Sequence, residues 1–281
     1  MSRTPSLSDW ASSRGEKWRA TVSGMEAMLA PVDEPLIQAL RLDSPCRVAD
    51  IGCGGGGTAF ALLRQAPEGS VVDGFDLSPA LVECARERAA SVERPISFEI
   101  ADLSTALPPS AGYDRLVSRF GVMFFHDPPA AFSNLLHWLA PESRFAFAVW
   151  GPPAQNLWVA TVREVVARFV EIPPSEPEAP GLFRYADVNK LLALLEGAGF
   201  TGLSASQWRG RLPVGGLVSP AEAAVFALAS FGSFAELLAE AGGEAFDEAR
   251  RSLADCFASQ QQEGAVRLDA CVHICTGVRA S

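Results

Sequence analysis

The sequence predicts an α/β fold in which a mostly parallel sheet is covered by helices. Two observations support this prediction. Short apolar segments alternate along residues 46–150 with segments whose apolar residues recur at helical spacing, and such alternation is typical of parallel strands joined by right-handed helical crossovers. A glycine-rich turn, Gly54 to Gly57, also lies between the first apolar segment and a helix. In folds of this class, ligands bind beyond the carboxyl ends of the strands.

The first predicted strand, within residues 46–51, carries a carboxylate, Asp50, just before the glycines. Glycine permits positive φ and a close approach of the backbone to a ligand, and the helix start adds unpaired N–H groups. The spacing of Gly52, Gly54 and Gly57 fits GxGxxG, which is a weak signal for a dinucleotide. A carboxylate facing this turn would repel a pyrophosphate and attract an ammonium group. We therefore expect a ligand with a cationic amino-acid end.

Two further acids follow at the ends of predicted strands. Asp76 ends the strand within residues 71–78, about where an acid would accept both hydroxyls of a ribose. Asp102 ends the strand within residues 96–103, where it could accept an exocyclic amine of adenine. Three acids at successive strand ends are a far more specific signal than the glycines alone.

With these residues, the sequence resembles the class I S-adenosylmethionine-dependent methyltransferases. Segments similar to the first, second and third motifs of that family are Asp50-Ile-Gly-Cys-Gly-Gly-Gly, Gly74-Phe-Asp76-Leu-Ser and Ala101-Asp102-Leu. The stretch from Tyr113 to Met123 is similar to the fourth strand and its loop, and comes close to the pattern of the ubiquinone and menaquinone C-methyltransferases. The resemblance is strong over residues 46–150 and weaker as far as residue 213.

The resemblance implies a Rossmann-like sheet of seven strands, mostly parallel, with an antiparallel last strand. It also implies S-adenosyl-L-methionine as the cofactor. Residues expected to bind this cofactor are Asp50, Gly52, Cys53, Gly54, Asp76, Leu77, Asp102, Leu103, Ser118 and Arg119. The predicted parts of the chain are an N-terminal helical cap (1–45), the cofactor-binding core (46–213), a helical insert between the last two strands (214–262) and the final strand (263–281).

The cap and the insert are both predicted to lie near the substrate. In this family an N-terminal helical segment commonly closes over the cofactor, so Trp10 and Trp18 could line a lid or simply pack the cap onto the core. Ser219 begins the first helix of the insert, and Phe226, Phe231 and Phe234 continue its apolar face. Apolar faces of this size are expected to be buried. We expect the insert to cover the substrate, and the alternative is that it forms a dimer surface.

Methyl transfer from a sulfonium requires mainly alignment of donor and acceptor and exclusion of water. An oxygen acceptor also benefits from a base, and His126, just beyond the fourth strand, is the candidate catalytic residue; otherwise it is a loop or cap residue. Candidate acceptor contacts are Trp18, Met123, Trp150, Asn156, Trp158 and Phe231, with core packing equally open for the tryptophans after the fifth strand. No metal-ligand motif is found, so no metal is expected.

Composition narrows the choice of partner. The chain of 281 residues has a net charge of −10, which argues against nucleic acid and anionic membrane surfaces as partners. No apolar run approaches the 18 residues of a membrane span, and no signal peptide is found. Six scattered cysteines are typical of reduced thiols in a cytoplasmic protein. A small-molecule substrate is expected, for either a monomer or a homodimer.

We therefore expect methyl transfer to an oxygen or carbon atom of a small apolar or aromatic metabolite of polyketide, quinone, terpenoid or phenolic type, in secondary metabolism. Three alternatives remain. One is an enzyme, such as a cyclase, that binds the sulfonium without transferring its methyl group. The second is an NAD-dependent oxidoreductase, which Asp50 disfavours. The third is a non-catalytic binding module.

Overall fold

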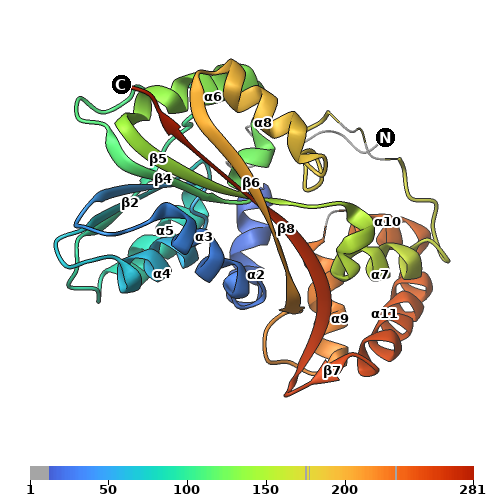
Figure 1. The fold of residues 1–281 in the computed structure, drawn as a ribbon. Coiled ribbons are helices and arrows are strands. Elements are labelled where there is room, and N and C mark those ends of the chain that lie inside the picture. Colours follow the sequence, from blue (N-terminus) through green and yellow to red (C-terminus); the bar gives the residue numbers. More distant parts are fainter. Residues whose placement is uncertain (1–12, 175, 177, 232) are drawn as a thin grey trace.

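The computed structural model describes residues 13–174, 176, 178–231 and 233–281, so Trp10 lies outside the described part. Seven strands form a sheet in the order β3-β2-β1-β4-β5-β8-β6 (Figure 1). They are β1 Arg47–Ile51, β2 Val71–Asp76, β3 Ile96–Ile100, β4 Tyr113–Arg119, β5 Leu139–Trp150, β6 Phe200–Pro213 and β8 Ala265–Arg279. The first five pair in parallel, and β8 runs antiparallel to both neighbours, β5 and β6. The predicted fold class is confirmed.

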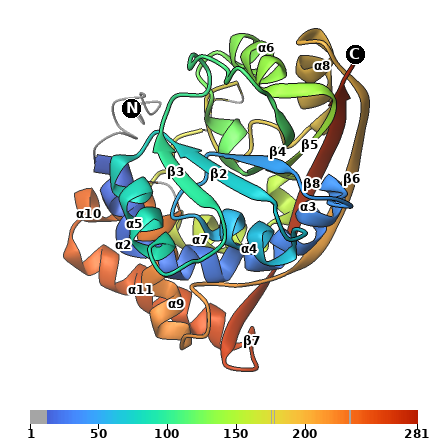
Figure 2. The ribbon, with the colours of Figure 1, turned by 90° about the vertical axis from the view of Figure 1, so that its left-hand side faces the viewer.

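Helices cover both faces of the sheet. Figures 1 and 2 show α3, α4 and α5 below the sheet and α6 and α8 above it. Their bounds are α3 Asp33–Leu40, α4 Gly57–Gln65, α5 Pro79–Ala89, α6 Pro128–Trp138 and α8 Val188–Gly197. Side-chain caps define two of the starts: Ser78 Oγ accepts from the Leu81 N–H at α5, and Asp127 accepts from the Ala130 N–H at α6. The crossovers thus begin at the strand ends where a ligand is expected.

The insert contains the helices α9 Pro220–Ser230, α10 Phe234–Ala241 and α11 Gly243–Ala258. Its predicted start is confirmed, because Ser219 and Glu222 form a reciprocal capping box. The prediction of a single continuous helix beyond Ser219 is wrong, because α9 ends at Ser230 and a separate helix, α10, begins at Phe234. The last helix of the insert, α11, ends at Ala258. Gln261–Gln262 then form strand β7, which pairs with β8 through a tight turn in which Glu263 and Gly264 both have positive φ.

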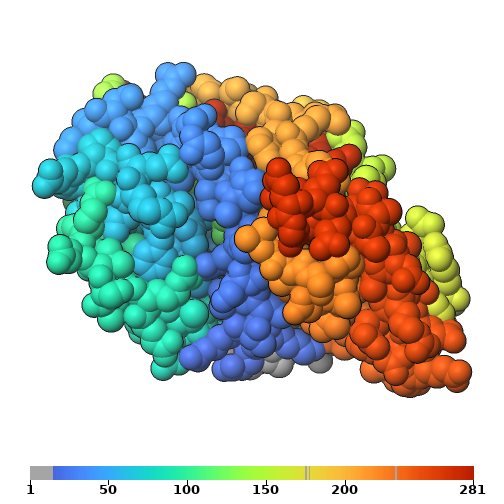
Figure 3. Space-filling view, turned by 90° about the horizontal axis from the view of Figure 1, so that it is seen from below, coloured from blue at the N-terminus to red at the C-terminus, as the bar shows by residue number. Residues whose placement is uncertain are grey.

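The insert packs against α2 Ser13–Leu29 and α7 Leu157–Val166 and so extends the core. Phe231 is 2% exposed, and its ring lies edge-on to that of Trp158 at 4.7 Å. Phe226 packs so closely on α2 that a Cβ on Gly24 would lie 2.8 Å from its ring. Seen from below, the orange surface of α9 abuts the blue surface of α2 (Figure 3). The aromatic face of the insert is therefore covered by protein.

In the part of the chain that the structure describes, no single helix has the length and apolarity to cross a membrane. The helices α9 and α10, which meet at a sharp bend, have the required length and apolarity only when they are counted together.

Truncating Phe231 tests this packing. Phe231→Ala removes a fully buried ring between α9 and α7, so we expect the free energy of unfolding to fall by about 3–5 kcal/mol in urea titrations. Leu217→Ala is the control, because Leu217 is 77% exposed near the start of the same insert, and its change should stay within about 0.5 kcal/mol. Equal losses in the two variants would contradict the packing described here.

Candidate cofactor cavity

A cavity of about 160 Å³ lies beyond the carboxyl ends of the strands β1 to β4 and is bounded on one side by α2. Its walls come from five segments that are distant in sequence: residues 18–29 of α2, 51–55 after β1, 75–81 after β2, 101–104 after β3 and 119–126 after β4. The sheet topology thus brings the predicted motifs together. Eight of the ten predicted cofactor residues line the cavity: Gly52, Cys53, Gly54, Asp76, Leu77, Asp102, Leu103 and Arg119.

The loop after β1 requires glycine where it meets the loop after β4. Gly52 has φ of +69°, and a Cβ at this position would lie 2.8 Å from the Cα of Gly121. Ser118 holds the two loops together, because its hydroxyl donates to the Ile51 carbonyl at 2.7 Å and accepts from the Gly121 N–H at 3.1 Å. Ser118 is fully buried and is not part of the cavity wall. The structure gives this predicted cofactor residue a role in joining the loops.

Asp76 faces the cavity at the end of β2. Its Oδ2 accepts from the Gly54 N–H at 2.9 Å and its Oδ1 from the Ser78 N–H at 2.8 Å. Burial raises the pKa of this carboxyl, and the backbone N–H groups of Ser78, Gly54 and Leu77 oppose the rise. A carboxylate oxygen has more than one acceptor position, so a carboxylate held in this way can also accept from a pair of hydroxyl groups.

Asp102 is fixed in a similar manner after β3. Its Oδ1 accepts from both the N–H and the hydroxyl of Ser104, at 2.9 and 2.6 Å. The apolar side chains of Leu77, Ala101 and Leu103 line the cavity beside it. An acceptor next to an apolar wall can bind a flat ring that carries an amine.

Asp50 lies behind the cavity rather than on its wall. It is 1% exposed, and neither carboxylate oxygen makes a hydrogen bond of good geometry with the described residues. Burial raises its pKa to about 7, Arg119 opposes the rise, and Asp33 and Asp76 add to it. Arg119 is already paired with Asp33 at 2.9 Å. Two buried carboxylates therefore share one guanidinium, which leaves a net negative charge when both are ionised.

Sequence reasoning missed Asp33 and Glu26. Asp33 begins α3 and also accepts from the Thr58 hydroxyl at 2.9 Å. Glu26 lines the cavity from α2 and pairs with Arg88 of α5 at 2.7 Å. Both acids act through tertiary pairs that no local pattern shows. The one available signal was that Glu26 interrupts an apolar helical face formed by Val22 and residues 25–29.

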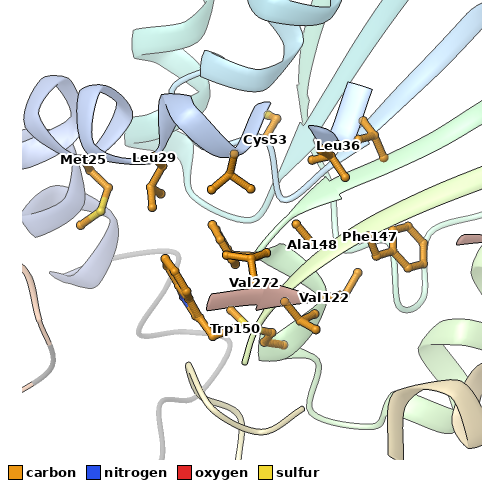
Figure 4. Close-up of a cluster of buried hydrophobic side chains, with 14 of the residues drawn as sticks. Met25, Leu29, Leu36, Cys53, Val122, Phe147, Ala148, Trp150 and Val272 are labelled. Atoms are coloured by element: carbon orange, nitrogen blue, oxygen red, sulfur yellow. The ribbon is translucent and has the colours of Figure 1, made fainter. Parts of the chain in front are cut away.

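The predicted acceptor contacts separate into two groups. Trp18 and His126 line the cavity, and His126 is exposed in the loop after β4. The other predicted contacts lie in the core: Met123, Trp150, Asn156, Trp158 and Phe231. Figure 4 shows Trp150 in the buried cluster that also contains Met25, Leu29 and Cys53.

Asn156 has a complete structural explanation. Its Nδ2 donates to the carbonyls of Gly151 and Pro152, and its Oδ1 accepts from the Cys271 N–H at 3.0 Å and the Trp158 indole N–H at 3.2 Å. The side chain joins the end of β5 to β8 and is fully buried. No part of it reaches the cavity wall.

The aromatic wall of the cavity is instead formed by Phe120, Phe124 and Phe125, which were not predicted. Phe120 has φ of +70°, an uncommon backbone conformation for a residue with a side chain. Its N–H donates to the Ala148 carbonyl at 3.0 Å, and its ring stacks on Trp150 at 4.1 Å. The buried Trp150 thus supports the ring that faces the cavity. The available signal was the Phe124–Phe125 pair directly before His126.

The fold and this cavity define a Rossmann-like domain of the class I methyltransferase type. Residues 48–142 match a family model described as a methyltransferase domain, so this part of the chain is a methyltransferase domain, and S-adenosylmethionine is the cofactor of its class. Among the residues that the structure describes, no group of three or more His, Cys, Asp or Glu could hold a metal ion.

Individual relatives agree with this assignment. The chain is 32% identical to a demethylmenaquinone methyltransferase of Deinococcus radiodurans over 120 residues, which are 43% of this chain and 49% of that protein. It is 31% identical to phosphoethanolamine N-methyltransferase 1 of Zea mays over 115 residues, 41% of this chain and 23% of the relative. The chain therefore spans half or less of the length of these relatives. The crystal structure of the YcgJ protein of Bacillus subtilis is similar in fold, with a TM-score of 0.56 and 16% identity, covering 89% of this chain and 98% of that one.

The raised pKa of Asp50 predicts a pH-dependent stability. Because the folded pKa of about 7 exceeds the unfolded value of 3.8, the folded state binds the extra proton, and this stabilisation is lost as the pH rises through 7. Asp50→Asn removes the titration, so its stability relative to the native chain should increase by roughly 2 kcal/mol between pH 5.5 and pH 8 in urea titrations.

Asp43→Asn is the matched control, because Asp43 is exposed and the substitution changes the net charge equally. A relative stability of Asp50→Asn that is flat over this pH range, like that of the control, would show that Asp50 does not titrate there.

Proposed function

We propose that this chain is an S-adenosylmethionine-dependent methyltransferase that transfers a methyl group to an oxygen or carbon atom of a small apolar or aromatic metabolite. One observation carries the proposal: a glycine loop, the acids Asp76 and Asp102 and an aromatic wall meet in one cavity at the carboxyl edge of a parallel sheet. The aromatic wall suits an acceptor of polyketide, quinone, terpenoid or phenolic type. We propose that the reaction belongs to secondary metabolism.

The residues present fit the cofactor. Asp76 would accept the ribose hydroxyls, and Asp102, beside Leu77 and Leu103, would hold the adenine. The amino-acid end would lie at the glycine loop, between the carboxylate of Glu26 and the guanidinium of Arg119. The buried and unpartnered Asp50 supports this orientation, because an ammonium group nearby would offset its charge. When bound, the cofactor supplies a methyl group that its sulfonium has already activated.

The chain's own residues would align the acceptor and exclude water. Trp18 of α2 and the rings of Phe120, Phe124 and Phe125 offer apolar faces to a flat molecule. Among the described residues that line the cavity, His126 alone has an imidazole, and we propose that it takes the proton of an oxygen acceptor or contacts the substrate. This placement favours a small-molecule substrate held under α2.

Cofactor binding tests the proposal at Asp76. Calorimetry should show that S-adenosylhomocysteine binds and NAD does not. Asp76→Ala removes the predicted hydrogen bonds to the ribose, each worth roughly 1–3 kcal/mol, so the affinity for S-adenosylhomocysteine should fall about ten- to a hundredfold. Glu99→Ala, which removes an exposed carboxylate from the neighbouring strand β3, should leave it unchanged. Binding of NAD without S-adenosylhomocysteine would reject the cofactor, and an unchanged affinity in Asp76→Ala would place the ribose elsewhere.

Turnover with labelled S-adenosylmethionine and a library of phenolic and quinol acceptors tests His126. If His126 is a general base, His126→Ala should lower kcat by about 10² while the affinity for S-adenosylhomocysteine holds. His137→Ala is the control, because His137 is equally exposed but lies on α6, where its Nδ1 contacts the Ser133 carbonyl at 2.8 Å. Near-native turnover in His126→Ala would favour catalysis by alignment alone. Bound cofactor without any methylated product would instead indicate a non-methylating enzyme.

A further inference from the structure

A second hollow lies between α3 and the strands β6 and β8 and shares no lining residue with the cofactor cavity. It has a volume of about 470 Å³, and among the described residues no carboxylate lines it. The chain as a whole, by contrast, has more acidic than basic residues, 33 against 23. Its polar lining includes Gln38, Arg41, Arg144, Ser206 and Thr276, and we call it the arginine groove.

Two arginines, Arg41 and Arg144, line the arginine groove, and the charge of a third, Arg115, acts on Arg144. Arg144 of β5 is the register partner of Arg115 on β4, and like charges on adjacent strand positions repel each other. Arg41 lies on the same side, directly after α3. Burial, together with the nearby charges of Arg41 and Arg115, lowers the pKa of Arg144. The protein therefore holds positive charge here at an energetic cost.

The fold explains Arg115 but not Arg144. Arg115 donates to the carbonyls of Leu40 and Arg41 at 2.7 and 3.1 Å, so it satisfies the end of α3 and complements the helix dipole. Arg144 is half-buried on a strand, and within the described residues its guanidinium has no hydrogen bond or ion pair. The nearest acid along α3, Glu34, accepts instead from the Gln38 amide at 2.5 Å. Even partial burial of a cation without a counterion is unfavourable.

We propose that the arginine groove binds a small molecule through a phosphate group. The guanidinium groups of Arg41 and Arg144 supply the positive charge, and the hydroxyls of Ser206 and Thr276 supply further donors. Arginine donors form strong, charge-assisted bonds to phosphate oxygens. Two guanidinium groups match a dianion better than a carboxylate with a single charge. This site is separate from the proposed methyl transfer and does not depend on it.

Titration with inorganic phosphate tests the proposal. The full chain is first saturated with S-adenosylhomocysteine. Isothermal titration calorimetry at low ionic strength should then show saturable binding of one phosphate ion per chain. Arg144→Gln and Arg41→Gln should each weaken it about ten- to a hundredfold, because each removes a charge-assisted bond. Arg168→Gln, which removes an exposed arginine of the surface pair with Glu164, should leave it unchanged. Acetate at the same ionic strength should bind at least tenfold more weakly.

Arg41→Gln keeps the test valid if Arg144→Gln does not fold, because Arg41 is exposed beyond the end of α3. Three results would overturn the proposal: no saturable binding of phosphate by the native chain, native affinity in the variants of the groove, or acetate binding as tightly as phosphate. Displacement of phosphate by S-adenosylhomocysteine in a competition titration would also overturn it, since phosphate would then occupy the cofactor cavity. A failure to bind S-adenosylhomocysteine would concern the methyltransferase proposal alone.

Discussion

The loops that follow β1 and β4 touch backbone to backbone, and the cavity depends on this contact. Gly52 and Gly121 approach so closely that neither position has room for a Cβ. The Ser118 hydroxyl bonds to both loops and closes the contact. Because the two strands are adjacent in the sheet, one short contact sets the position of the glycine loop and of the aromatic segment after β4. The glycine loop and the aromatic wall of the cavity are thereby fixed relative to each other.

The pairing of β1 with β4 also determines the electrostatics beneath the loop. Arg119 ends β4 and Asp50 lies in β1, so the pairing of these strands brings the cation and the buried acid together. Asp33 then holds the guanidinium from the N-terminus of α3, where a carboxylate is also favoured by the helix dipole. Burying Asp50 without a partner costs stability. This destabilising carboxylate lies next to the cavity, and ionisable groups with strongly shifted pKa values are typical of ligand-binding sites.

The sequence predicted the features that local patterns encode. Glycines, strand-end acids and apolar periodicity are properties of neighbouring residues. They were sufficient to predict the fold class, the helix start at Ser219 and most of the candidate residues that the structure brings to one cavity. The role of Asp33 arises from residues far apart in the chain and has no local signature. Trp150 shows a different limit: its place at the end of β5 was predicted, but it is buried behind Phe120 and is not part of the cavity wall. Local pattern cannot distinguish an aromatic residue on a wall from one behind it.

The insert illustrates how a segment can shape a site without lining it. Among the described residues, none from 214–262 reaches the cavity wall, yet α2, which does, is held between the core and the insert. Arg19 of α2 pairs with Glu83 of α5 on one side, and Lys17 pairs with Glu236 of α10 on the other. Surface pairs contribute little individually, so the apolar packing of Phe226 on α2 carries most of the contact. Phe226 of the insert therefore affects the cavity wall through the position of α2.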